Sequence, residues 1–86
     1  MNRYLIETPH TEQDCLNLIQ LVNAAGYLTH FDWGCKCGVH SGWAIIEAEN
    51  EAEARLCVPP LVRGRARVVQ LNKFDPASVP PLHNRA

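Results

Sequence analysis

Three features of the sequence predict an α+β fold. Four short apolar runs have the β-branched and aromatic composition of strands, at residues 3–8, 27–33, 43–48 and 65–74. Two segments between them, residues 12–25 and 51–58, have helix-forming sequence. The elements therefore follow one another as strand–helix–strand–strand–helix–strand. This order predicts a ferredoxin-like βαββαβ domain, in which a four-stranded antiparallel sheet carries two helices on one face.

The first helix has clear signals at both of its ends. Thr11 is placed to cap its N-terminus, and Gly26 is expected to end it in a left-handed conformation. One apolar stripe runs along the helix at Cys15, Leu18, Ile19, Val22 and Ala25. Cys15 is therefore predicted to pack as a small apolar residue. His10 precedes the cap and is expected to be exposed.

The second half of the chain is predicted in the same way. The second and third strands are expected to form an antiparallel hairpin across the glycine-containing segment 34–42. Trp33 and Trp43 flank this segment and are predicted to form a cross-strand aromatic pair. Asn50 can cap the second helix, and the prolines at 59–60 must end or kink it because each lacks an N–H group.

The size and composition of the chain favour one domain. Its 86 residues are expected to form that domain at residues 1–75, followed by an extended or disordered, proline-rich tail at residues 76–86. The formal net charge is −1, and the arginines at 63–67 are too few for a nucleic-acid footprint. No apolar run approaches the ~20 residues of a membrane span, and the N-terminus lacks the pattern of a signal peptide. We expect a cytoplasmic location, where the four cysteines stay reduced unless they bind metal or do redox chemistry.

The predicted sheet has one uncovered apolar face. Two short helices cover one face only, and a second face in contact with water would require apolar and polar residues to alternate cleanly. The segments YLI, WAII and VV instead place apolar side chains on both faces. A second copy of the same sheet is the simplest cover, and small domains often need such association. We therefore expect a homodimer, a dimeric α+β barrel with a cavity between the two sheets.

Three segments, RYLIE, WAIIEAENEAEA and VVQLNKFDP, resemble the small dimeric α+β barrel proteins, and within them the short members that include nickel-binding proteins. The resemblance covers roughly residues 3–76 and implies a homodimer. In the nickel-binding relatives a histidine near the end of the second strand is among the ligands, and the matching position here is His30. The segment WGCKCGVHSG departs from the family because it is longer and contains cysteines, so the metal and its ligand set stay open. Other families of this shape are monooxygenases or isomerases, and the fold alone therefore defines no activity.

The segment HFDWGCKCGVHSGW (residues 30–43) is the richest in side chains that bind metals. Cys35 and Cys37 are two residues apart and would point to the same side of an extended strand. His40 follows three residues later, and the glycines around it let the backbone fold back. Thiolates and imidazoles together suit zinc, nickel or copper, and His30 or Asp32 could supply a fourth ligand. The predicted ligands are Cys35, Cys37, His40 and His30.

Two other interpretations of this segment stay open. It could be a hairpin tip that only packs against the second subunit, which would make the protein a structural interaction module. It could also border a small-molecule pocket at the barrel mouth, with a lining of Tyr4, Asp32, Trp33 and Trp43. An enzyme of the barrel monooxygenase or isomerase type would then use His30 in the cavity, or a cysteine nucleophile with a histidine base. We favour a small cytoplasmic homodimer that binds a transition metal or a small ligand near residues 30–43, rather than an enzyme.

Overall fold

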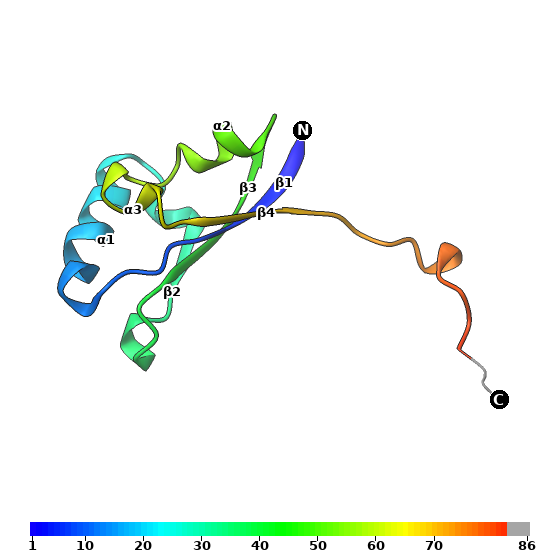
Figure 1. The fold of residues 1–86 in the computed structure, drawn as a ribbon, viewed down its shortest axis with the longest axis horizontal. Helices are drawn as coiled ribbons and strands as arrows, with labels where there is room; N and C mark the ends of the chain where they lie inside the picture. Colours follow the sequence, from blue (N-terminus) through cyan, green and yellow to red (C-terminus); the bar gives the residue numbers. More distant parts are fainter. Residues whose placement is uncertain (83–86) are drawn as a thin grey trace.

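The computed structural model describes residues 1–82 of the chain as a four-stranded sheet with short helices packed against it (Figure 1). The strands are β1 (Asn2–Glu7), β2 (Phe31–Trp33), β3 (Gly42–Ala48) and β4 (Arg67–Leu71). The α-helices are α1 (Cys15–Ala24), α2 (Glu51–Arg55) and α3 (Pro60–Arg63). The 3-10 turns are η1 (Glu12–Asp14), η2 (Leu28–His30), η3 (Cys35–Cys37) and η4 (Pro76–Ser78). The predicted α+β class and the four-stranded antiparallel sheet are confirmed.

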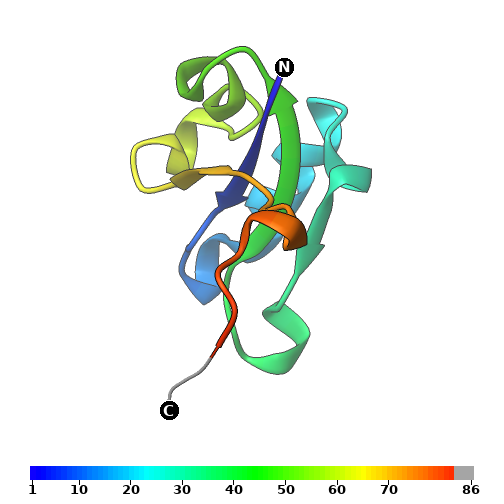
Figure 2. The ribbon, with the colours of Figure 1, turned by 90° about the vertical axis from the view of Figure 1, so that its right-hand side faces the viewer.

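The strands lie side by side in the order β2-β3-β1-β4, and every neighbouring pair is antiparallel. β1 is therefore central, between β3 and β4. The connection from β1 to β2 contains α1, and the connection from β3 to β4 contains α2 and α3. Figure 2 looks onto the sheet, with α1 behind it.

The core lies between the helices and one face of the sheet. Side chains alternate along a strand, and Tyr4 and Ile6 of β1 are both buried on the helix side. Leu18 and Val22 lie one turn apart on α1 and are fully buried, as the apolar stripe predicts. The Thr11 side chain accepts a hydrogen bond from a backbone N–H of the first turn, and Gly26 has a φ of +86°. The predicted cap and the left-handed end of this helical segment are thus confirmed.

The opposite face of the sheet is apolar along its centre and stays open in residues 1–82. Leu5 lies directly across from Ile45 on β3 and from Val69 on β4, so the three side chains form one row across the sheet. Ile45 is 54% exposed. Trp43 and Leu71 lie on the same side of their strands as this row, two residues away from it, and are half-buried. We call the surface formed by Leu5, Trp43, Ile45, Val69 and Leu71 the outer face.

The hairpin differs from its prediction in two respects. β2 is shorter than expected because residues 28–30 form the turn η2. The register places Trp33 opposite Gly42, and Trp43 opposite Asp32. Successive positions along a strand face opposite sides, so Trp33 points to the helices and Trp43 to the outer face. The predicted pairing of the two tryptophans is therefore wrong.

The second helical region is divided in two. Asn50 caps α2, because its side-chain oxygen accepts a hydrogen bond from the Glu53 N–H at 2.8 Å. α2 ends at Arg55, before the prolines, and α3 starts at Pro60, where the missing N–H would have no helical partner in any case. None of the helices in the described part of the chain has the length and apolar character needed to cross a bilayer.

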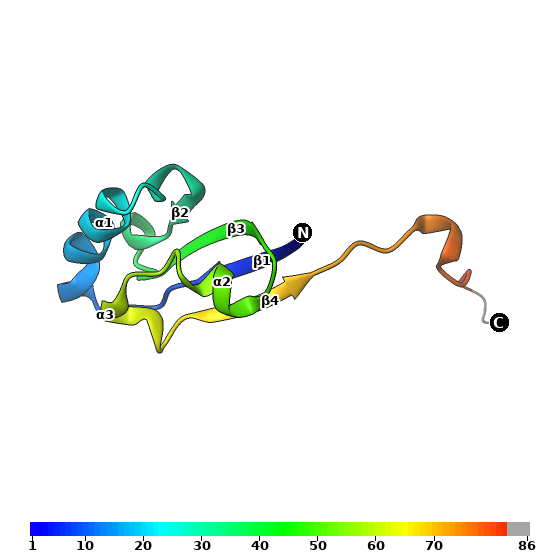
Figure 3. The same ribbon diagram turned by 90° about the horizontal axis from the view of Figure 1, so that it is seen from above.

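The chain beyond β4 leaves the domain and runs away from it (Figures 1 and 3). The Asp75 side chain accepts a hydrogen bond from the Ala77 N–H and so caps η4. Phe74 and Leu82 are exposed apolar side chains on this segment. The tail predicted at residues 76–86 thus contains one 3-10 turn, and residues 83–86 of it lie outside the described residues.

Candidate metal centre

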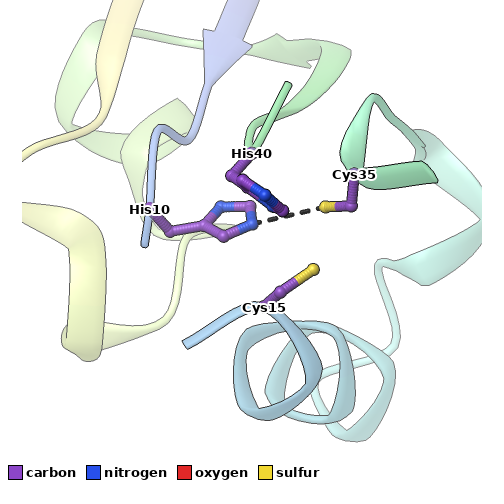
Figure 4. Close-up of side chains that lie close together, drawn as sticks. All are labelled: His10, Cys15, Cys35 and His40. Carbon is purple, nitrogen blue, oxygen red and sulfur yellow. Dashed lines mark hydrogen bonds between the residues drawn. The ribbon is translucent and has the colours of Figure 1, made fainter. Parts of the chain in front are cut away.

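Four side chains that bind metals meet at one end of the sheet. They are His10, Cys15, Cys35 and His40, and one ligand atom from each lies within 4.8 Å of all the others. Figure 4 shows the four side chains pointing toward a common centre. His10 follows β1, Cys15 begins α1, Cys35 begins η3, and His40 precedes β3. We call this group the Cys2His2 cluster.

Backbone pairing beyond the end of β1 places the two histidines next to each other. The Thr8 N–H donates to the Gly42 carbonyl at 2.9 Å, and the His10 N–H donates to the His40 carbonyl at 3.0 Å. The Thr8 hydroxyl also accepts a hydrogen bond from the Gly42 N–H at 3.1 Å. These bonds continue the β1–β3 ladder past both strands, so the register of the sheet fixes the spacing of the two rings.

The tip of the hairpin turns Cys35 back toward His40. The N–H groups of Cys37 and Val39 both donate to the Gly34 carbonyl, at 2.9 and 3.0 Å. Gly38 has a φ of +82°, a left-handed conformation that a residue with a Cβ rarely adopts. The tight turn built on these bonds brings the two ends of the tip, at residues 35 and 40, to the same side.

The His10 ring is held in one orientation by the backbone. Its Nδ1 lies 2.8 Å from the Thr8 carbonyl oxygen, and because a carbonyl can only accept, Nδ1 carries the proton. The other nitrogen, Nε2, faces the cluster and lies within hydrogen-bond distance of the Cys35 sulfur, at 3.4 Å. Metal-binding histidines are commonly fixed in this way, by a hydrogen bond from the ring nitrogen that does not touch the metal. His10 is 8% exposed, so the prediction that it is exposed is wrong.

His40 contributes a buried nitrogen that is not satisfied by the protein. Its Nδ1 is buried and has no hydrogen-bond partner among residues 1–82. A buried polar atom without a partner costs free energy, and such atoms are uncommon in folded proteins. Its ring lies edge-on to that of His10, with 6.1 Å between the ring centroids. Coordination of this nitrogen would remove that cost.

The two cysteines of the cluster interact with each other. A hydrogen bond with Cys35 is the main reason why the pKa of Cys15 is raised to about 11; burial and the negative charges of Cys35 and Glu12 act in the same direction. Two thiolates this close repel each other in the absence of a cation. A bound metal ion reverses this preference, because it stabilises both thiolates directly.

The spacing of the cluster is close to that of a tetrahedral ion. With metal–sulfur bonds of about 2.3 Å and metal–nitrogen bonds of about 2.0 Å, neighbouring ligand atoms of an ideal tetrahedron are about 3.3 to 3.8 Å apart. The His10 Nε2 to Cys35 sulfur distance of 3.4 Å lies within that range. The largest separation in the cluster is at most 4.8 Å, so movements of about an ångström would complete the site.

The structure brings two of the four predicted ligands, Cys35 and His40, into the cluster. Cys37 lies at the other end of η3 and is exposed. His30 is exposed at the end of η2, before β2, and borders the outer face. The sequence predicts no ligand role for His10, and it predicts that Cys15 packs as an apolar residue on the stripe of its helix. The spacing of these residues is one signal that could have indicated both ligands, because His10–Cys15 and Cys35–His40 are each five residues apart.

The residues predicted to line a small-molecule pocket are divided between the two sides of the sheet. On the outer face a cavity of about 370 Å³ is lined by Leu5, His30, Asp32, Trp43, Ala44 and Ile45. Trp33 lines a different cavity of about 330 Å³, which it shares with Ile19 of α1 and with Cys35. Tyr4 is 4% exposed and belongs to the core.

Comparison with known proteins identifies no family for this chain. No protein-family model matches the chain, and neither a curated protein nor a solved structure matches it. The case for a function therefore depends on the site itself.

Proposed function

We propose that the chain binds a zinc ion through His10, Cys15, Cys35 and His40. The observation that carries this proposal is the convergence of two sulfur and two nitrogen ligand atoms within 4.8 Å of one another. Zinc, nickel and copper all accept these ligands, but Cu(II) and Ni(II) favour square-planar arrangements. A closed set of two cysteines and two histidines is typical of tetrahedral structural zinc. Nickel and copper are the alternatives that metal analysis distinguishes.

The role that follows for the ion is structural. Four protein ligands leave no open position for water or substrate, unlike the sites of catalytic zinc. The ion would join the end of β1, the start of α1, the hairpin tip and the start of β3. A domain of this size has a limited core and often depends on such a cross-link. A reducing compartment such as the cytoplasm would keep both thiols available as ligands.

Metal analysis of protein purified without an affinity tag tests this proposal. We expect one zinc ion per chain in the unmodified protein and its loss in the His10→Gln/Cys35→Ser variant. The matched control is His30→Gln/Cys37→Ser, which changes one histidine and one cysteine outside the cluster and should keep the ion. Retention of zinc by the first variant, or its loss from the second, would show that the ligand set is wrong.

We also propose that the domain is a ferredoxin-like homodimer in which two outer faces meet, as in a dimeric α+β barrel. The strand order β2-β3-β1-β4 with antiparallel neighbours supports the ferredoxin-like arrangement. The apolar row of Leu5, Ile45 and Val69 supports the dimer, because contiguous exposed apolar surface typically marks an interface. A second subunit would also enclose the cavity beside His30 and Asp32, which is the place for a small ligand.

Sedimentation of a charged variant tests the dimer. Ile45→Asp places a charge in the centre of the outer face and should convert a dimer to monomers. Leu16→Asp is the matched control, because Leu16 is an exposed apolar residue on α1, where it is 66% exposed. A protein that sediments as a monomer without any substitution would remove this part of the proposal and leave the metal site unaffected.

A further inference from the structure

The Cys2His2 cluster contains two thiols that are far apart in sequence and close in space. On the basis of the proposed metal site, we propose that Cys15 and Cys35 are also a site of reversible oxidation: a hydroperoxide converts the pair to a disulfide, and the metal is released. Oxidation of these two thiols would then control whether the site holds a metal ion.

The geometry selects this pair among the four cysteines. Cys15 and Cys35 come from α1 and η3, and their sulfur atoms lie within 4.8 Å of each other. Their side chains point toward the same centre in Figure 4. Both are partly exposed, so a small oxidant can reach them, whereas Cys57 is buried. A disulfide needs a sulfur–sulfur distance of about 2.05 Å, so the two sulfurs must approach by less than about 3 Å.

Cys37 is a poor alternative partner for Cys35. The two residues stand at the ends of one 3-10 turn, and Cys37 is exposed and outside the cluster. A disulfide between residues only two apart closes a small, strained ring. Cys15 approaches from a separate helix and has no such constraint.

The oxidation is balanced without any further reactant. The sulfur of one thiolate attacks a peroxide oxygen, the O–O bond breaks, and a sulfenic acid and an alkoxide form; the alkoxide takes a proton from water. The second thiolate attacks the sulfenic sulfur, the S–S bond forms, and hydroxide leaves. Two electrons have passed from the two thiolates to the peroxide. Metal ligation requires thiolates, so the ion loses two of its four ligands and is left with two histidines.

The test uses the whole chain loaded with zinc and treated with hydrogen peroxide. Zinc release is followed with a coloured chelator, and the disulfide is located by trypsin digestion without reduction. Cleavage after Arg3, Lys36 and Arg55 leaves Cys15 and Cys35 in one peptide, residues 4–36, and Cys37 in the next, residues 37–55. A Cys15–Cys35 disulfide therefore lies within one peptide, whereas a Cys35–Cys37 disulfide links two.

We expect one zinc ion released per Cys15–Cys35 disulfide, and recovery of binding after a dithiol reductant and zinc are added. The Cys37→Ser variant should release zinc as the unmodified protein does. Formation of a disulfide through Cys37, or oxidation without release of zinc, would overturn the inference while the zinc site stands. Protein that takes up no zinc overturns both proposals, and the pairing of the thiols can still be mapped in it.

Discussion

The Cys2His2 cluster and the cavity on the outer face both contain side chains that can bind metals, but the two regions bring them together differently. In the cluster, four segments of the chain place their ligand atoms within 4.8 Å, and His10 is almost fully buried. On the outer face, His30 and Asp32 are exposed beside an open cavity. Within residues 1–82 the cluster is the one group of at least three such side chains that could hold an ion. Convergence from distant segments, rather than proximity in sequence alone, is what creates the candidate site.

The largest expected effect on stability comes from zinc binding at the Cys2His2 cluster. At a free zinc concentration about 100 times the Kd, binding stabilises the folded chain by about 2.7 kcal/mol. For a domain of this size, that raises Tm by on the order of 10 °C. Thermal unfolding with and without zinc measures the shift, and the His10→Gln/Cys35→Ser variant should show none. An equal shift in that variant would mean that zinc stabilises the chain from another place.

The next largest effect on stability is expected at Gly42, which lies against the Trp33 ring. A Cβ on Gly42 would lie 2.7 Å from the Trp33 ring and 3.0 Å from the Thr8 hydroxyl, so Gly42→Ala should overpack the strand beside the cluster. We expect a loss of about 1–3 kcal/mol in the free energy of unfolding. Gly64→Ala is the control, because a Cβ there meets nothing within 4 Å among the described residues. Equal effects of the two substitutions in urea unfolding would show that Trp33 is not packed on Gly42.

The fold could be predicted largely because its signals are local. The caps at Thr11 and Asn50 and the left-handed Gly26 depend on residues within one turn, and each was expected from the sequence. The positions of Trp33 and Trp43 depend on the hairpin register, which a difference of one residue reverses. That dependence explains why the predicted tryptophan pair is wrong although the hairpin exists.

The candidate site was accessible from the sequence only where its residues are neighbours. Cys35 and His40 belong to one short segment, and their proximity followed from the glycines around them. His10 reaches the cluster only because β1 pairs with β3 and its backbone donates to His40. Cys15 fits the apolar stripe of its helix as well as it fits the cluster, so periodicity alone favoured the core. Pairing between distant strands is the information that a pattern within one segment does not contain.

Cys57 is a buried thiol outside the cluster, and it predicts a loss of stability at alkaline pH. Burial is the main reason why its pKa is raised from 9.0 to about 11. Well below pH 9 the thiol is neutral in both states. As pH rises through 9, the unfolded chain loses this proton first, so stability falls as pH rises toward 11. At pH 10 the loss from this residue is about 1.4 kcal/mol. The free energy of unfolding, measured against pH for the unmodified protein and for Cys57→Ala, both loaded with zinc, isolates this loss. Identical pH profiles of the two proteins would contradict the raised pKa of Cys57.

The smallest effect is expected on the outer face. The indole Nε1 of Trp43 donates to a Glu7 carboxylate oxygen at 3.0 Å, in a half-buried contact. Trp43→Phe removes this hydrogen bond and should reduce the free energy of unfolding by about 1 kcal/mol. Zinc content should not change, because Trp43 lies on the opposite side of the sheet from Trp33 and the helices. A loss of zinc from this variant would show that the two regions are coupled.

X-ray absorption spectroscopy at the zinc edge tests the central claim most directly. With His10, Cys15, Cys35 and His40 as ligands, the spectrum should fit two sulfur atoms at about 2.3 Å and two nitrogen atoms at about 2.0 Å. Three sulfur atoms would bring Cys37 into the site, and a shell of nitrogen and oxygen alone would exclude both cluster thiols. Either result would contradict the ligand set on which this account depends.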